Sequence, residues 1–310
     1  MPGPGDRPLH IGLLSPALPS KGLSNGIATY VRVMRDAFRS LGHLVTLADP
    51  DQIEFSDGTV ADLPMSRGLK SRAEMLVEAW RGRDASTAYV RLRYLAAFQA
   101  LKEAGAEIVE VEESWGWASR IAGRGIPIVM RLHGPHAFAR ESQARNRIDR
   151  RREAAELRAF RRVQAVSSPS SSVLQAMLDQ GGQTQLARVI LNPVPLPGAR
   201  WSLEKADPDQ ILFVGRFDLL KGADVVIRAF AAALKKRDSL KLVMVGPDRG
   251  LGGTVRFEQF VQGIPPKARQ NIVFAGELPP DRVTRLRLQS ALAVVASRYE
   301  TFSYTAFEAQ

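Results

Sequence analysis

Short apolar runs alternate along the chain with segments whose apolar residues recur at the spacing of an amphipathic helix. In the first half this helical spacing is clearest at 26–42, and apolar runs predict strands at 10–16, 44–49, 107–113, 126–134, 164–168 and 187–194. In the second half a helix is predicted at 221–236, and strands at 210–217, 241–246, 271–276 and 291–297. Strands that alternate with helices are typical of parallel sheets covered by helices. The predicted fold class is therefore α/β.

The alternation breaks between 192 and 209, where the chain is rich in proline and polar residues. We expect a domain boundary near Pro197, with one Rossmann-like domain at 1–197 and a second at 198–310. In sheets of this kind, ligands bind beyond the carboxyl ends of the strands. The loops that follow the strands are therefore the places to look for chemistry.

Composition narrows the kinds of chemistry that the chain can perform. The 310 residues are 45% hydrophobic, which is enough for the cores of two domains, and the absence of cysteine excludes disulfides, thiolate metal sites and thiol nucleophiles. No apolar signal segment opens the chain and no long apolar stretch follows, so we expect a cytoplasmic protein. The net charge of +11 favours an anionic partner, whether a phosphorylated substrate, a phospholipid surface or nucleic acid.

The loop after the first predicted strand is rich in small residues and opens the first helix. Gly22 and Gly26 permit a close approach of the backbone, and the N-terminus of a helix attracts anions. Ordinary turn chemistry explains this loop equally well, and its spacing differs from the G-x-G-x-x-G of dinucleotide sites. The loop is a candidate phosphate contact only in combination with other signals.

A second loop, at the start of the second domain, contains two cations, Arg216 and Lys221. A guanidinium grips a phosphate group by a forked contact, and an ammonium acts as a point charge, so together they can neutralise a diphosphate. The alternative is that both are solvated loop cations. Asp218 lies between them and can pair with either.

The last predicted strand is followed by RYETFSYTAFEAQ, in which seven residues separate Glu300 from Glu308. Ser303 fits the N-cap of a helix that begins there. Carboxylates at this edge of the sheet suit the hydroxyls of sugars and riboses, although Glu308 can equally be an ordinary glutamate in the first turns of a helix. Because the sequence stops within this helix, we expect it to be a fragment of a longer chain.

Four blocks resemble the GT-B glycosyltransferases of the large retaining group called family 4, or glycosyl transferases group 1. They are NGIATYV with LGHLVTL, then RLHG, VGRFDLLKG and YETFSYTAFEA, in that order along the chain. The resemblance covers nearly the whole chain, and the last two blocks together are the most specific. It implies a GT-B fold, in which two Rossmann-like domains face each other across a cleft, with the second domain incomplete.

The resemblance also implies transfer of a sugar from a nucleoside-diphosphate sugar to an acceptor held mainly by the N-terminal domain, with retention of configuration. Arg216 and Lys221 then hold the donor diphosphate, and Gly26 is a further diphosphate contact. Glu308 contacts the donor ribose.

The predicted catalytic residues are His133 and Glu300, both assigned by the same resemblance. His133 reaches the sugar near its anomeric centre, and Glu300 contacts hydroxyls of the transferred sugar. From position alone, His133 can equally be a buried structural side chain at the end of a strand. Among the other histidines, His136 is a weaker candidate, and His43 is interpreted as part of a structural turn.

No metal or other cofactor is expected, because Arg216, Lys221 and a helix dipole can stabilise the departing diphosphate. The donor base, the donor sugar and the acceptor stay unassigned. A saccharide and a lipid-linked acceptor are both open, and the latter implies peripheral contact with the inner face of the membrane.

Two rival interpretations stay open. Asp49 and Asp51 have the D-x-D spacing of metal-binding glycosyltransferases of the other fold, although a turn that contains proline explains them more simply. The basic stretch 145–163 is either a solvated helix face or a surface that binds an anion. Aromatic residues are not interleaved with its cations, so nucleic acid is the least favoured partner. The alternative function is a catalytically inactive chain that binds an anionic surface or partner.

Overall fold

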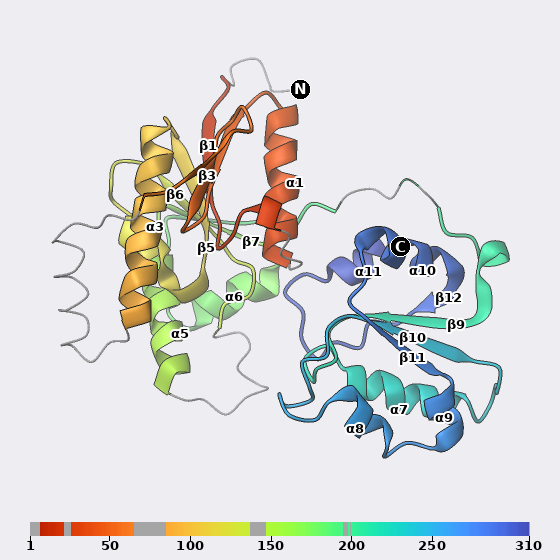
Figure 1. The fold of residues 1–310 in the computed structure, drawn as a ribbon. Coiled ribbons are helices and arrows are strands. Elements are labelled where there is room, and N and C mark those ends of the chain that lie inside the picture. Colours follow the sequence, from red (N-terminus) through yellow and green to blue (C-terminus); the bar gives the residue numbers. More distant parts are fainter. Residues whose placement is uncertain are drawn as a thin grey trace. The chain divides into compact units, whose positions relative to one another are not determined.

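The structure is a computed structural model that describes residues 7–21, 26–64, 85–136, 147–194, 198 and 200–309 (Figure 1). The chain divides into two compact units, Met1–Pro193 and Val194–Gln310. This division lies shortly before the predicted boundary at Pro197, a residue outside the described ones. Each unit has its own sheet and its own core.

The first unit is built on an eight-stranded sheet with the order β4-β3-β2-β1-β5-β6-β7-β8. Its strands are β1 (His10–Leu14), β2 (Leu44–Ala48), β3 (Gln52–Glu54), β4 (Val60–Asp62), β5 (Ile108–Glu112), β6 (Ile128–Arg131), β7 (Ala165–Ser168) and β8 (Leu186–Val189). Neighbours pair in parallel, except that β3 is antiparallel to both β2 and β4. The chain therefore starts near the centre of the sheet and adds strands outward in both directions, which is a doubly wound arrangement.

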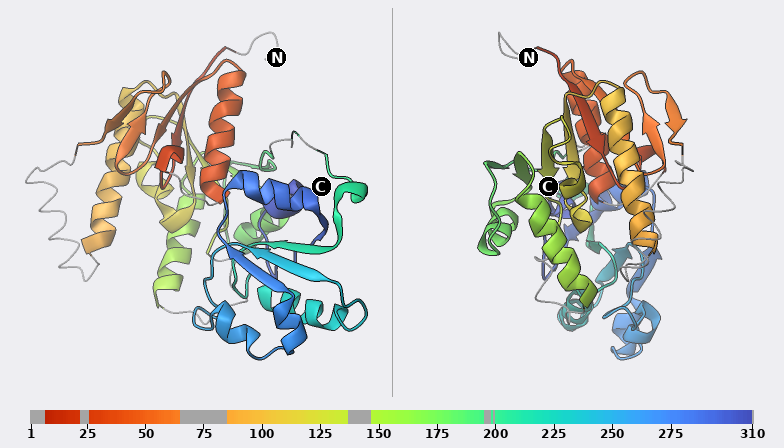
Figure 2. Two further views of the ribbon diagram at one scale, coloured as in Figure 1. Left: turned by 45° about the vertical axis from the view of Figure 1, so that its right-hand side comes forward. Right: turned by 90° about the vertical axis from the view of Figure 1, so that its left-hand side faces the viewer.

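Helices cover both faces of this sheet. Helix α1 (Gly26–Ser40) packs on one face, and α3 (Ala85–Glu103), α4 (Ala118–Ile121), α5 (Arg147–Phe160) and α6 (Ser171–Asp179) pack on the other. Figure 2 shows α1 and α3 on opposite sides of the strands. In β1, Leu13 joins the core under α1 while Leu14 joins the core under α3, because successive strand residues point to opposite faces. Two short 3₁₀ turns, η1 (Pro19–Lys21) and η2 (Ser114–Gly116), follow β1 and β5.

The second unit has a parallel four-stranded sheet with the order β11-β10-β9-β12. Its strands are β9 (Asp207–Val214), β10 (Lys241–Val245), β11 (Ile272–Gly276) and β12 (Ser290–Ala293), after the 3₁₀ turn η4 (Leu203–Lys205). Helices α7 (Ala223–Ala233), α8 (Phe257–Val261) and α9 (Pro266–Gln270) pack on one face, and α10 (Pro280–Gln289) covers the other (Figure 1). Helix α11 (Tyr304–Glu308) follows β12.

The predicted strands are all present, with small differences at their ends. β9 begins at Asp207, before the predicted 210, and β12 ends at Ala293, before the predicted 297. β3 and β4 were not predicted, because they are only three residues long and β4 is exposed throughout. The predicted helix at 221–236 begins later, at Ala223, because Gly222 before it adopts a left-handed conformation with φ of 69°.

Candidate functional site

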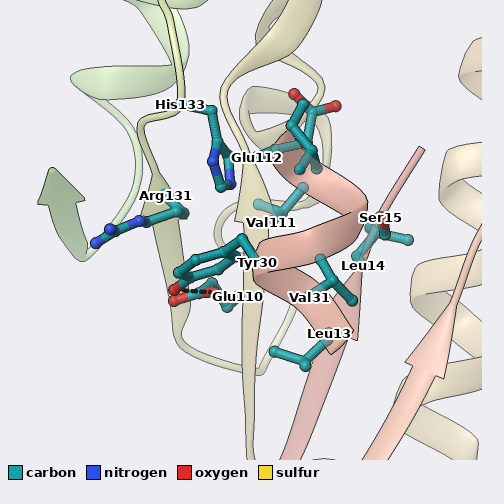
Figure 3. A pocket seen from close by; sticks show the side chains of 11 residues that line it. Leu13, Leu14, Ser15, Tyr30, Val31, Glu110, Val111, Glu112, Arg131 and His133 are labelled. Atoms are coloured by element: carbon teal, nitrogen blue, oxygen red, sulfur yellow. Dashed lines mark hydrogen bonds between the residues drawn. The ribbon is translucent and has the colours of Figure 1, made fainter. Parts of the chain in front are cut away.

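In the first unit the strand order switches direction between β1 and β5, whose carboxyl ends lie side by side. Open α/β sheets bind ligands at such switch points. A cavity of about 10 Å³ lies here, lined among others by Leu14 and Ser15 at the end of β1, Glu112 at the end of β5, Tyr30 of α1, and His133 (Figure 3). A cavity of this size holds about one water molecule.

His133 follows β6 and points its imidazole toward this cavity (Figure 3). The ring packs edge-on against Tyr30, with 4.8 Å between the ring centroids. Burial, and then the positive charge of Arg131, lowers the pKa of His133 from 6.5 to about 3. The imidazole is therefore neutral at physiological pH, so it can exchange hydrogen bonds with a hydroxyl group but supplies no positive charge.

A polar layer of Tyr30, Glu110 and Arg131 lies beside the cavity. The Tyr30 hydroxyl donates to Oε1 of Glu110 at 2.9 Å, and the guanidinium of Arg131 lies 4.8 Å from the centroid of the Tyr30 ring (Figure 3). Arg131 is almost fully buried, and its Nη2 donates to the carbonyl of Ile190 and the side chain of Asn192. Burial raises the pKa of Glu110. These contacts hold the Tyr30 ring against which His133 packs.

Glu113 holds the backbone that carries His133. Its two carboxylate oxygens accept the N–H groups of His133 at 2.9 Å and of Gly134 at 2.8 Å. Burial, with the nearby charges of Glu112 and Glu156, raises the pKa of Glu113 to about 8. Glu113 is not among the residues that the sequence predicted for the site. Its position at the end of the apolar run 107–113, where functional side chains of parallel sheets gather, was the signal available.

Gly26 is the first residue of α1, and the first turn of this helix contains no acidic residue. The positive end of the helix dipole is therefore not neutralised by a side chain of its own first turn. Gly22 and Asn25 lie outside the described residues. A contact between Gly26 and a diphosphate stays a prediction.

Asp49 and Asp51 lie in a turn in which both carboxylates have protein partners, and Asp51 pairs with Arg93 of α3 at 2.5 Å. Asp49 is fully buried, and its side chain accepts the N–H groups of Leu18, Asp51 and Gln52 at 2.8 to 2.9 Å. Its carboxylate also pairs with Lys21 at 2.6 Å. Within the described part of the chain, no group of three or more His, Cys, Asp or Glu side chains is arranged to hold a metal ion.

The other histidines make local structural contacts. His43 Nδ1 accepts the N–H of Leu9 at 3.1 Å, which ties the turn before β2 to the start of β1. His10 contacts the Thr46 hydroxyl at 2.8 Å. His136 lies 3.0 Å from a carboxylate oxygen of Asp149.

In the second unit the switch point lies between β9 and β12, because β10 and β11 follow on one side of β9 and β12 on the other. The loops after these two strands, 215–222 and 294–303, therefore leave the same edge of the sheet from adjacent positions. The first loop contains Arg216 and Lys221, and the second contains Glu300.

Asp218 organises the two cations predicted to bind a diphosphate. Its carboxylate accepts a hydrogen bond from Arg216 Nε at 2.7 Å and another from the backbone N–H of Lys221 at 2.7 Å. The Arg216 side chain is 45% exposed, so its guanidinium is accessible to a ligand. Between the cations, Phe217 anchors the loop, because its ring is fully buried and packs edge-on against Phe257.

Lys221 and Glu300 pair directly. Lys221 Nζ lies 2.7 Å from Glu300 Oε1, and the Ser297 hydroxyl donates to the same oxygen at 2.7 Å. The structure thus brings the three predicted residues together, because Asp218 joins Arg216 to the backbone of Lys221, and the Lys221 side chain pairs with Glu300. Binding of a donor diphosphate by Arg216 and Lys221 stays a prediction.

Glu308 lies in the short helix α11, which begins as predicted. The Ser303 side chain accepts the N–H of Ala306, which confirms Ser303 as the N-cap. The Glu308 carboxylate pairs with Arg287 of α10, a partner that the sequence analysis did not identify. The ribose contact of Glu308 stays a prediction.

The basic stretch lies mainly on α5, and several of its cations have structural partners. Arg152 pairs with the buried Glu156 at 2.7 Å and lies 5.1 Å from the centroid of the Trp115 ring. Arg161 Nε donates to the Gly181 carbonyl at 2.9 Å. Residues 145 and 146 lie outside the described ones. Anion binding by this stretch stays a prediction.

Two family models match the chain. The model described as Glycosyltransferase Family 4 matches residues 24–196, which is more than half of the chain, and the model described as Glycosyl transferases group 1 matches residues 199–310. The chain belongs to glycosyltransferase family 4. The family resemblance inferred from the sequence motifs is therefore confirmed.

Curated relatives match this family 4 protein over part of its length. A D-inositol 3-phosphate glycosyltransferase from Acidothermus cellulolyticus is 32% identical over 104 residues, which are 32% of this chain and 23% of the relative. A protein of the same name from Segniliparus rotundus is 29% identical over 111 residues, 34% of this chain and 23% of the relative. The match thus spans about a quarter of the length of these relatives.

Solved structures resemble the family 4 protein over nearly all of its length. Sucrose-phosphate synthase from Thermosynechococcus elongatus gives a TM-score of 0.64 at 19% identity, covering 97% of this chain and 78% of that one. The catalytic domain of starch synthase IV from Arabidopsis thaliana, bound to ADP and acarbose, gives 0.63 at 14% identity, covering 98% and 81%. At these identities the likeness concerns the fold, and it confirms the predicted GT-B class. No helix among the described residues combines the length and the apolarity needed to span a bilayer.

Proposed function

We propose that this family 4 protein transfers a sugar from a nucleoside-diphosphate sugar to a hydroxyl acceptor, with retention at the anomeric carbon and without a metal ion. The observation that carries the proposal is the cluster at the switch point between β9 and β12, where Asp218 and Glu300 hold Arg216 and Lys221. Family membership supports the activity, and retention rests on the family resemblance. The ADP bound to starch synthase IV, a structural neighbour, supports the donor class.

The two cations of the cluster suit the departure of a diphosphate. As the bond from the anomeric carbon to the diphosphate oxygen breaks, its electron pair leaves with the nucleoside diphosphate and negative charge grows there. The acceptor oxygen bonds to the anomeric carbon, and its proton passes to the departing phosphate oxygen. Arg216 and Lys221 stabilise the negative charge where it develops. With these charges in place, the proposed reaction needs no metal ion for the leaving group.

The two glutamates are assigned to hydroxyl groups of the donor. When the diphosphate engages Lys221, Glu300 Oε1 loses its ammonium partner and accepts a hydrogen bond from the transferred sugar instead. Hydrogen bonds to a carboxylate are roughly twice as strong as those between neutral groups, so this exchange favours a hydroxyl-rich ligand. Glu308 is assigned to the ribose, where it shares its charge with Arg287.

We assign His133 a hydrogen bond to a hydroxyl group of the reacting sugar. Since its pKa is lowered to about 3, His133 is not protonated at neutral pH and does not act as a general acid. Its neutral imidazole still offers one hydrogen-bond donor and one acceptor. The first unit is assigned to the acceptor. The curated relatives are named for a phosphorylated polyol, and the net charge of +11 suits an anionic or lipid-linked acceptor of a cytoplasmic enzyme.

Isothermal calorimetry with UDP, GDP and ADP tests the donor assignment. We expect the wild-type chain to bind at least one of the three, and Arg216→Ala with Lys221→Ala to abolish that binding. The matched control is Lys235→Ala with Lys236→Ala, which removes the same charge from exposed positions beyond the far end of α7. Equal affinity in the wild type and the Arg216/Lys221 variant would overturn the diphosphate site.

The chemistry itself is tested by turnover. In a reaction with a nucleotide sugar and a saccharide acceptor, proton NMR should show a product with the anomeric configuration of the donor, and EDTA should leave the rate unchanged. Inversion of the anomer would contradict retention. Loss of activity in EDTA, restored by a divalent cation, would contradict the metal-free mechanism.

A further inference from the structure

The two loops of the donor cluster approach each other closely in the second unit. The backbone of Gly222, at the end of the first loop, lies so near the second loop that a Cβ there would be 1.9 Å from the carbonyl oxygen of Ala296. Beyond this approach, one side chain of the second loop reaches several groups of the first. That side chain is Arg298, two residues before Glu300.

Arg298 contacts the first loop through both its backbone and its guanidinium. Its N–H donates to the carbonyl of Leu220 at 2.9 Å, and its Nη1 donates to the carbonyl of Leu219. The guanidinium also forms a fork on Asp224, with Nη1 to Oδ1 at 2.7 Å and Nη2 to Oδ2 at 2.8 Å. Asp224 lies in the first turn of α7 and is 2% exposed. Arg298 therefore connects the second loop to the loop and the helix that carry and follow Lys221.

A forked contact to a buried carboxylate fixes the orientation of the guanidinium, because two parallel hydrogen bonds define its plane. The partner Asp224 is itself held, since it lies on a regular helix whose apolar face is buried. Its hydrogen bonds to Arg298 lower the pKa of Asp224, so the carboxylate is ionised at neutral pH and keeps the fork. The pair of Arg298 with Asp224 therefore connects a rigid helix, α7, to the loop that contains Glu300.

The other direct link between the loops, the pair of Lys221 with Glu300, consists of groups that are themselves assigned to the donor. A diphosphate that engages Lys221 competes with Glu300 for the ammonium and so weakens this pair. The partners of Arg298, which are two backbone carbonyls and the carboxylate of Asp224, have no assigned contact with the donor. The contacts assigned to the donor therefore do not compete with those of Arg298.

We propose that Arg298 is a positioning residue, which keeps the loop with Arg216 and Lys221 in register with the loop that contains Glu300 while the donor is bound. This inference rests on the proposed function, because it takes the cluster to be the donor site. Arg298 acts through the other residues and has no contact with the donor itself. Without the Arg298 side chain, the loop with Arg216 and Lys221 can shift relative to the loop with Glu300, although all three residues remain.

The test compares three variants of the full chain in calorimetric titrations with UDP, GDP and ADP. Arg298→Ala removes the side-chain links, and Arg298→Lys keeps the charge but cannot form the planar fork. The matched control is Arg228→Ala. Arg228 lies one turn further along α7 and also pairs with Asp224, at 3.3 Å, so this substitution removes the same charge from the same carboxylate. We expect Kd to rise about tenfold in both Arg298 variants, which corresponds to one lost hydrogen bond to a charged group, and to stay unchanged in Arg228→Ala.

Hydrogen exchange measured by mass spectrometry gives a second readout that needs no ligand. Exchange at 298–303 and 219–222 should be faster in Arg298→Lys than in Arg228→Ala, while the strands of the same sheet keep their protection. A general loss of stability would raise exchange in the strands as well. The comparison of Arg298→Lys with Arg228→Ala therefore distinguishes a loss of loop positioning from a general loss of stability. It can be made even if Arg298→Ala fails to fold.

The outcomes distinguish the inference from the function on which it rests. If the Arg216/Lys221 variant loses binding while both Arg298 variants bind like Arg228→Ala, the positioning role is wrong and the donor site stands. If the Arg216/Lys221 variant binds like the wild type, or the wild type binds none of the three diphosphates, the donor site is wrong and the positioning role falls with it. Weaker binding in both Arg298 variants, with normal strands, supports the proposal.

Discussion

Replacing Gly222 with alanine perturbs the point at which the two donor loops approach most closely. Gly222 has φ of 69°, and an added Cβ would lie 1.9 Å from the Ala296 carbonyl oxygen. The left-handed conformation costs a residue with a side chain roughly 1–2 kcal/mol. Relieving the overlap forces the loops apart and adds roughly 1–3 kcal/mol, as overpacking does elsewhere. We expect the free energy of unfolding of the second unit to fall by roughly 2–5 kcal/mol.

Two other glycines of the same unit separate these two costs. Gly252 also has a positive φ, 60°, but an added Cβ would meet nothing within 4 Å, so alanine there carries only the conformational cost. Gly263 has no positive φ, and its nearest contact would be at 3.5 Å, so alanine there carries neither. Thermal unfolding followed by circular dichroism should show the smallest loss of Tm in Gly263→Ala, a larger loss in Gly252→Ala and the largest in Gly222→Ala. Each kcal/mol corresponds to roughly 3–6 °C for a unit of this size.

Equal losses of Tm in Gly222→Ala and Gly252→Ala would refute the close approach of the loops, because the overlap would then add nothing. Binding provides a second comparison. Gly222→Ala should weaken the affinity for nucleoside diphosphates, since Lys221 precedes it, whereas Gly252→Ala should leave this affinity unchanged. A stable Gly222→Ala variant with wild-type affinity would show that the loop geometry is not needed for binding.

Three further predictions concern single side chains. The folded-state pKa of Glu113 is raised to about 8, so the folded protein binds an extra proton above the unfolded pKa of 4.5, and stability falls as pH rises toward 8. The lowered pKa of His133 makes stability rise with pH, but only below pH 6.5. Urea unfolding between pH 6.5 and 8 should therefore show stability falling with pH in the wild type, and falling less steeply in Glu113→Gln. An equally steep fall in Glu113→Gln would contradict the prediction. His133→Ala should lower kcat by roughly 100-fold with unchanged calorimetric affinity for the nucleoside diphosphate, and unimpaired turnover would remove its role. Glu308→Ala should weaken the binding of a nucleoside diphosphate about tenfold but not that of inorganic pyrophosphate, and equal losses would argue against a ribose contact.

The sequence predicted the fold well where strands are buried on both faces. In such strands nearly every residue is apolar, as in HIGLL of β1, so the run stands out from the helical segments around it. β3 and β4 give no such signal, because they form a three-residue hairpin extension whose outer strand is exposed. The start of β9 was also misplaced, since its pairing with β12, and not the apolar run, determines where it begins.

The candidate site was predictable in its residues but not in its pairing. Arg216, Lys221 and Glu300 follow strands, and the carboxyl ends of parallel strands meet at one edge, so their gathering there follows from the topology. Asp218 is close enough in sequence that its pairing could be anticipated. Pairs between residues far apart in the sequence could not be predicted, because they depend on how the helices pack on the sheet. The pair of Arg298 with Asp224 joins residues 74 positions apart.

In the second unit, the cations assigned to the diphosphate are paired with carboxylates before any donor arrives. Arg216 is held by Asp218, and Lys221 is held by Glu300. Binding of a diphosphate is therefore an exchange of partners, whose net free energy is much smaller than the attraction of two free cations for a dianion. On the proposed function, this exchange links the two halves of the donor, because Glu300 Oε1 loses its ammonium partner when the diphosphate takes Lys221. A free sugar without the diphosphate meets a carboxylate that is already neutralised, so recognition of the sugar depends on the nucleotide to which it is attached.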